Sequence, residues 1–64
     1  MFGEKLKLIR KEKKLTQKEL AEKSGIGVQT LRNYEQGIGN PTWSSVVALA
    51  TALGVSTEAF REDK

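Results

Sequence analysis

Apolar residues recur along this chain at steps of three and four positions, the spacing of helices that bury one face. The first such stripe predicts a helix over residues 3–13, and its members are Phe2, Leu6 and Ile9. Leu8 falls outside the stripe. No glycine marks the end of this helix, so we expect Lys13 or Lys14 to adopt the left-handed conformation, at a cost of about 1 kcal/mol.

A clear start signal predicts a second helix over residues 17–24. Thr16 can accept a hydrogen bond from the backbone N–H of Glu19, whose carboxylate can reach back to Thr16, which is the capping-box arrangement. Gly25 ends this helix, because glycine permits a tight left-handed turn. A third helix is expected to follow almost at once.

The third helix is predicted over residues 28–36, with Gly37 at its end. Its periodicity turns Leu31 and Tyr34 inward. Four side chains turn the other way, namely Val28, Gln29, Arg32 and Asn33. Two short helices joined by a turn of about four residues with a glycine have helix-turn-helix geometry, which fits a DNA major groove.

Turn-forming residues over 38–41 predict a loop after the third helix. Beyond it, Thr42 can cap a fourth helix over residues 43–53, which Gly54 ends. A last short helix is predicted over residues 57–61. Five helices without any strand pattern give an all-α fold class.

The chain's size and composition exclude several classes of protein. Its 64 residues suffice for one domain over 1–64, near the lower size limit for folding without a disulfide or a metal. It has no cysteine and no histidine, which removes thiolate metal sites and the commonest general base. The carboxylates are scattered over predicted helix surfaces. We therefore expect no enzyme, no metal site, no cofactor and no small-molecule ligand.

Hydropathy and charge bear on location and partners. No apolar run is long enough to span a membrane and no secretory leader is evident, so we expect a cytoplasmic protein without membrane contact. Eleven basic and eight acidic side chains give a net charge of +3, and six of the basic ones lie within residues 1–14. This basic front suits a chain that turns one face to a polyanion, although a solvated lysine-rich helix face explains it equally well.

The outward face of the predicted third helix carries amides rather than charge. Gln29 and Asn33 lie four positions apart, hence on one face, and a side-chain amide can pair with the N6 and N7 atoms of adenine. Val28 beside them can touch a thymine methyl group. Two amides on a short helix are more often solvated surface, and only their place in a two-helix turn favours base reading.

Several segments of the chain resemble the phage repressor and Cro family, also called the xenobiotic-response-element family. These are the segment LTQKELA over residues 15–21, Gly25, residues 31–37, Pro41 and residues 53–56. The resemblance covers essentially the whole chain and implies a compact five-helix lambda-repressor-like bundle. It also implies sequence-specific binding of double-stranded DNA by a transcriptional regulator or its DNA-binding domain, with helix 28–36 in the major groove.

The same resemblance implies roles for individual residues. It places Gln17 where its amide either braces the recognition helix or contacts phosphate and the outermost base, beside the readers Gln29, Val28 and Asn33. It implies a buried ion pair between Arg10 and Glu35 that fixes the recognition helix. Phosphate contacts are expected from Thr16, Arg10, Lys18, Gly27, Arg32, Asn40, Thr42, Trp43 and Ser44.

Three departures from the family weaken particular contacts. Gly27 lacks the hydroxyl that usually caps the recognition helix, the loop over 38–41 has no lysine or arginine, and Lys14 replaces a usual glycine. The uncharged loop motivates an alternative function, a protein-interaction module of the antitoxin-like or coactivator-like kind.

The single tryptophan, Trp43, leaves two interpretations open. The favoured one packs it partly buried against Tyr34 or the loop. If it is exposed, it can join Ile38 and residues 55–60 in a patch through which two copies meet on a palindromic DNA site. We expect a monomer in solution and a weak homodimer on DNA.

Overall fold

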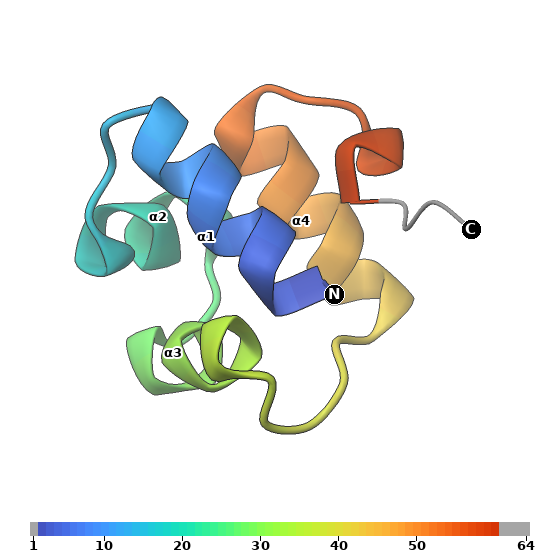
Figure 1. Cartoon of the computed structure of the whole chain (residues 1–64). Coiled ribbons are helices and arrows are strands. Elements are labelled where there is room, and N and C mark those ends of the chain that lie inside the picture. The colour runs from blue at the N-terminus through green and yellow to red at the C-terminus, as the bar shows by residue number, and fades with distance from the viewer. Residues whose placement is uncertain (1, 61–64) are drawn as a thin grey trace.

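The computed structural model describes residues 2–60, which form one helical array (Figure 1). Its elements are α1 (Phe2–Glu12), α2 (Gln17–Ser24), α3 (Val28–Gln36), α4 (Trp43–Leu53) and a 3-10 turn, η1 (Thr57–Phe60). No strand occurs within this range, so the all-α prediction is confirmed. The predicted bounds of α2, α3 and α4 agree with the structure, and α1 begins and ends one residue earlier than expected.

The predicted fifth α-helix is wrong in type. Thr57–Phe60 is a four-residue 3-10 turn, and position 61 lies outside the described residues. The backbone N–H of Ala59 donates to the Ser56 carbonyl oxygen at 2.9 Å, three residues back. So short a segment cannot close several four-residue hydrogen bonds, and the tighter 3-10 pattern suits it better.

Local capping signals explain where the helices begin and end. The backbone N–H of Glu19 donates to Thr16 Oγ1 at 3.0 Å, and the Thr16 N–H donates to Glu19 Oε1 at 2.8 Å, which completes the capping box. Thr42 caps α4 in the same way, accepting from the Ser45 N–H at 3.1 Å. Lys14 has a φ of 60°, so the left-handed residue expected at the end of α1 is present.

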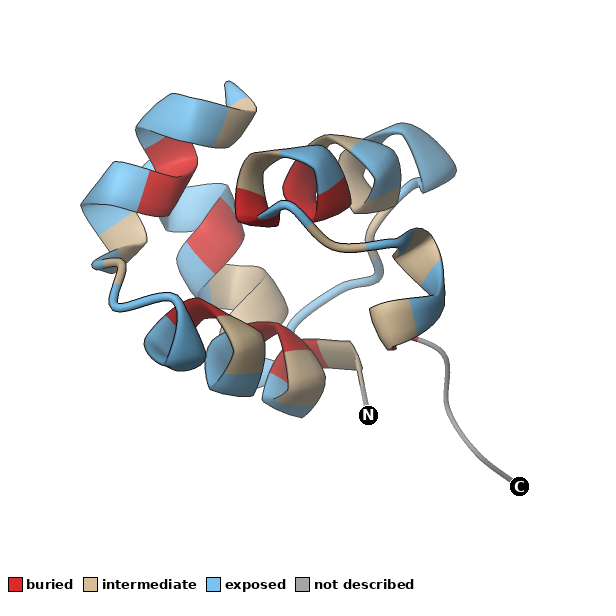
Figure 2. Cartoon of the chain, turned by 90° about the horizontal axis from the view of Figure 1, so that it is seen from above, coloured by how far each residue is buried: buried red, intermediate tan, exposed pale blue. Residues whose placement is uncertain are grey.

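Each of the four α-helices contributes one fully buried leucine to the centre of the core. These residues are Leu6, Leu20, Leu31 and Leu49. Seen from above in Figure 2, the buried positions lie on the inward sides of the helices, as amphipathic stripes require. Leu8, which is outside the stripe of α1, is 60% exposed.

A close backbone approach joins the start of α1 to the end of α3. A Cβ atom added at Gly3 would lie 2.3 Å from the carbonyl oxygen of Tyr34 and 3.0 Å from that of Glu35. The neighbouring Phe2 ring meets the Tyr34 ring edge-to-face, with centroids 6.2 Å apart. Only glycine fits here, a requirement that the sequence reading missed.

The favoured expectation for Trp43 is wrong, because its side chain is 70% exposed. Two neighbours occupy the surroundings of Tyr34 instead: the Phe2 ring packs on its ring, and Ser45 Oγ accepts from its hydroxyl at 3.2 Å. Trp43 is the first residue of α4, directly after its cap, and borders an apolar hollow. The other lining residues are Phe2, Val46, Thr57, Glu58 and Phe60.

Candidate nucleic-acid interface

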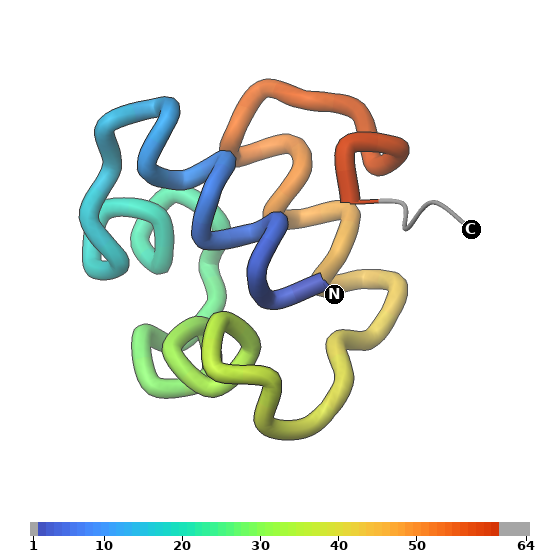
Figure 3. Tube along the Cα trace, viewed as in Figure 1, coloured from blue at the N-terminus to red at the C-terminus, as the bar shows by residue number. Residues whose placement is uncertain are grey.

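A short turn over residues 25–27 joins α2 to α3, and the backbone trace in Figure 3 follows it from one helix to the other. Gly25 has a φ of 76° and donates its N–H to the Ala21 carbonyl oxygen at 2.9 Å. Ile26 packs half-buried against the core. Helices α2 and α3 therefore form the helix-turn-helix pair that the sequence predicts.

The outward face of α3 carries four side chains, and three of them are exposed as the sequence predicts. Val28, Gln29 and Arg32 are exposed, and Asn33 is half-buried. Gln29 Nε2 donates to Asn33 Oδ1 at 3.1 Å. The amide pair thus leaves one acceptor, Gln29 Oε1, and one donor, Asn33 Nδ2, without a partner in the described chain.

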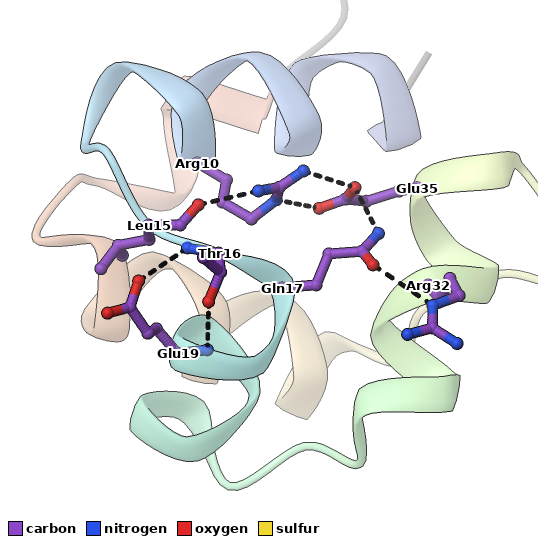
Figure 4. A network of polar contacts seen from close by, with 7 residues as sticks. All are labelled: Arg10, Leu15, Thr16, Gln17, Glu19, Arg32 and Glu35. Atoms are coloured by element: carbon purple, nitrogen blue, oxygen red, sulfur yellow. Dashed lines mark hydrogen bonds and ion pairs between the residues drawn. The ribbon is translucent and has the colours of Figure 1, made fainter.

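Beneath this face, Arg10 of α1 and Glu35 of α3 form an ion pair (Figure 4). Arg10 Nε donates to Glu35 Oε2 at 2.6 Å and Arg10 Nη2 donates to Oε1 at 3.2 Å. Arg10 Nη1 donates to the Leu15 carbonyl oxygen at 2.7 Å, just before α2 begins. Only 10% of the Arg10 side chain and 3% of the Glu35 side chain are exposed. The pair therefore joins α1 to α3, and to the loop before α2, through desolvated charges.

Gln17, the first residue of α2, extends this network to the surface. Its Nε2 donates to Glu35 Oε1 at 3.0 Å, and its Oε1 accepts from Arg32 Nε at 3.2 Å (Figure 4). The free structure therefore places Gln17 as a brace between α2 and α3. Sequence reasoning did not foresee its contact with Arg32, because no local pattern signals a hydrogen bond between residues 15 positions apart.

The remaining phosphate candidates fall into two groups. Those around the start of α2 and the turn before α3 are Thr16, Lys18 and Gly27. Those in the α3–α4 loop and at the start of α4 are Asn40, Thr42, Trp43 and Ser44, all exposed. The hydroxyls of Thr16 and Thr42 already cap helices, and Gly27 has no side chain with which to cap α3.

Positive charge is sparse near α3. Arg32 lies on the helix itself and Lys18 on α2, whereas residues 33–60 contain no lysine or arginine. Among residues 2–60 no three metal-ligating side chains gather at one place, and no helix there has the length and apolarity to cross a membrane. Amides, hydroxyls, one arginine and one lysine are thus the recognition chemistry that this surface offers.

Comparison with known proteins matches this arrangement closely. The helix-turn-helix family matches residues 6–60. The immunity repressor protein of Bacillus phage phi105 is 44% identical over 58 residues, which are 91% of this chain and 40% of the repressor. The chain spans about half the length of several other curated relatives.

Two solved structures have nearly the same fold. The restriction-modification controller protein C.AhdI from Aeromonas hydrophila superposes with a TM-score of 0.90 at 32% identity, covering 92% of this chain and 89% of that one. The SinR protein/SinI protein complex contains a chain with a TM-score of 0.92 at 31% identity, with coverages of 98% and 62%. Similarity thus extends across the core and both helices of the helix-turn-helix pair.

Proposed function

The chain belongs to the helix-turn-helix family, and we propose that it binds double-stranded DNA sequence-specifically, as a transcriptional regulator or the DNA-binding part of one. In this proposal α3 lies in the major groove and α2 crosses the backbone above it. The proposal rests on the outward face of α3, where Gln29 Oε1 and Asn33 Nδ2 have no hydrogen-bond partner in the described chain. The ion pair between Arg10 and Glu35 holds this helix against α1. Its named relatives are repressors and regulators, which supports a non-enzymatic role in the cytoplasm.

Adenine is the base that suits the amide pair. Its major-groove edge presents an N6 donor beside an N7 acceptor. The free Gln29 Oε1 can accept from N6, while the free Asn33 Nδ2 can donate to N7. Val28, one turn before Arg32 on the same helix, can contact a thymine methyl group.

Phosphate contacts position the protein without reading sequence. The backbone N–H groups at the start of α2, the Thr16 hydroxyl and Lys18 can meet one phosphate, where the positive end of the helix dipole favours an anion. The Gly27 N–H can contribute before α3. The hydroxyls of Thr42 and Ser44 and the indole N–H of Trp43 can meet another phosphate. Because the loop carries no cation, we infer a weaker nonspecific attraction than a basic loop would provide.

Two copies are proposed to meet on a palindromic site through exposed apolar side chains. Trp43, Ile38 and Val47 are exposed, and the hollow beside Trp43 is lined by Phe2, Val46 and Phe60. Such a weak homodimer would place two copies of α3 about one DNA turn, roughly 34 Å, apart. The patch is small, which fits association on DNA and a monomer in its absence.

Selection of bound duplexes from a random pool tests DNA binding, specificity and half-site spacing together. We expect a palindromic motif whose binding falls steeply with salt, because cations released from phosphates drive association. With about four phosphates contacted, the association constant should drop roughly 150-fold between about 50 and 200 mM salt. An association constant that does not change over this range would refute phosphate binding.

Gln29→Ala should relax the base preference at one position of the selected site by about 1 to 3 kcal/mol, because it removes the acceptor proposed for adenine N6. Binding to duplexes substituted at each position in turn measures this. The control, Lys18→Ala, should weaken all duplexes alike, since a phosphate contact carries no sequence information. If Gln29→Ala weakened binding to all duplexes equally, Gln29 would not read a base.

A protein-interaction module is the second candidate function. The exposed Trp43 and the cation-free loop favour it, and a chain of similar fold occurs in the SinR protein/SinI protein complex. An NMR titration with selected duplexes separates the two candidates. Shifts clustered at Gln17, Gln29 and Asn33 support DNA binding, and the absence of shifts with any duplex supports the protein partner.

A further inference from the structure

We propose that Arg32 reads a guanine in the major groove and that Gln17 is the residue that positions it. This inference rests on the proposed function, since it requires α3 to lie against DNA. It changes the role expected of both residues: Arg32 becomes a base reader rather than a phosphate contact, and Gln17 acts through Arg32 rather than on a base.

The hydrogen-bonding of Arg32 leaves its terminal nitrogens available. Nε, the nitrogen nearest the helix, donates to Gln17 Oε1 at 3.2 Å, and Figure 4 shows the two terminal nitrogens turned away from Gln17. Nη1 and Nη2 have no partner among the residues that the structure describes. A guanine presents two acceptors, O6 and N7, on its major-groove edge, and a guanidinium that approaches with two N–H groups satisfies both.

The guanidinium is oriented by a chain of contacts that ends in the core. Gln17 Oε1 holds Arg32 Nε, Gln17 Nε2 is held by Glu35 Oε1 at 3.0 Å, and Glu35 is held by Arg10. Exposure decreases along this chain, from the exposed Arg32 through the half-buried Gln17 to Glu35 with 3% of its side chain exposed. Each contact limits the rotamers of the next side chain, so less conformational entropy is lost when Arg32 binds.

The position of Arg32 on α3 favours a base over a phosphate. Arg32 follows Val28 by one helical turn, in the row next to the amide pair of Gln29 and Asn33. Val28, Gln29 and Arg32 are exposed, and Asn33 is half-buried. A phosphate contact needs only a nearby positive charge, which Lys18 on α2 can supply with a flexible side chain. A planar guanidinium fixed at Nε offers instead the two parallel donors that distinguish guanine from other bases. We therefore expect a guanine beside the adenine read by the amide pair.

The test measures the affinity of the full chain for a selected duplex and for its single-base-pair variants. Arg32→Ala should lower affinity for the selected duplex by about 5- to 150-fold and abolish the preference at one G·C pair only. Arg32→Lys, which keeps the charge but not the planar pair of donors, should lose the same preference. Lys23→Ala, an exposed α2 variant that also removes one positive charge, serves as the matched control and should leave every base preference unchanged.

Gln17→Ala tests the positioning role. It should weaken the preference at the same G·C pair, and it should have no further effect on that preference when Arg32 is already alanine. The fold should persist, because Arg10 Nη2 still donates to Glu35 Oε1, and circular dichroism checks this. A Gln17→Ala effect on a different base pair, or one that persists in the Arg32→Ala background, would overturn the positioning role.

The outcomes separate this inference from the proposed function. If no duplex is selected, DNA binding itself fails. If a motif is selected but Arg32→Ala weakens every duplex alike, or Arg32→Lys binds as the unchanged protein does, Arg32 contacts phosphate and the inference fails while DNA binding stands.

Discussion

Glu35→Ala is expected to lower the free energy of unfolding by about 3 to 5 kcal/mol, because it leaves the Arg10 guanidinium buried without its counter-charge. Only the hydrogen bond from Nη1 to the Leu15 carbonyl oxygen would remain to Arg10. Since domains of this size have little stability to lose, much of the protein would unfold at ambient temperature. Chemical denaturation followed by circular dichroism measures the loss.

Two further variants show whether the effect comes from the buried charge. Glu22→Ala removes an exposed carboxylate from α2 and should change stability by no more than about 0.5 kcal/mol. Replacing both partners together, with Arg10→Met and Glu35→Leu, should recover most of the lost stability, because no charge is then left unpaired in the core. A double variant no more stable than Glu35→Ala alone would contradict this account.

Leu31→Ala is expected to lower the free energy of unfolding by about 2 to 5 kcal/mol. Leu31 is the one fully buried residue that α3 contributes, so truncating it opens a cavity beside Leu6, Leu20 and Leu49 and removes the main apolar contact of the recognition helix. Urea denaturation should show a lower midpoint, and amide hydrogen exchange should show the lost protection across α3.

Leu8→Ala is the matched control for this substitution. It removes the same atoms from a side chain that is 60% exposed, and stability should change by no more than about 0.5 kcal/mol. If Leu8→Ala and Leu31→Ala destabilised the protein equally, burial would not be what fastens α3 to the core.

Local sequence signals sufficed to predict most of the fold. The Thr16 capping box, the cap at Thr42 and the glycine after each of the last three helices depend on neighbours within four positions, and the predicted helix bounds followed from them. The last turn was misread because a cap, Ser56, and an apolar residue, Phe60, look the same in an α-helix and in a 3-10 turn. Length decides between the two, and four residues favour the tighter form.

Contacts between distant residues could not be predicted in the same way. Trp43 stays exposed because Phe2, 41 positions earlier, packs on Tyr34, and nothing near Trp43 in the sequence signals that competition. The amide of Gln17 is bonded to Glu35 and Arg32, which depends on side-chain rotamers that only the assembled helices define. For the candidate site, the sequence therefore predicts which residue types gather on α3 but not how they pair.

The close approach at Gly3 bears on the alignment of the protein along a DNA groove. Contact between α1 and α3 is so tight that a single added carbon would lie 2.3 Å from the Tyr34 carbonyl oxygen, where ordinary contact begins at 3.4 Å. Relieving that shortfall of about 1.1 Å by moving α3 would shift its reading side chains by roughly a third of the ~3.4 Å between successive base pairs. In a chain that reads DNA through α3, Gly3 of α1 would thus determine which base pairs the side chains of α3 meet, although it touches no base itself.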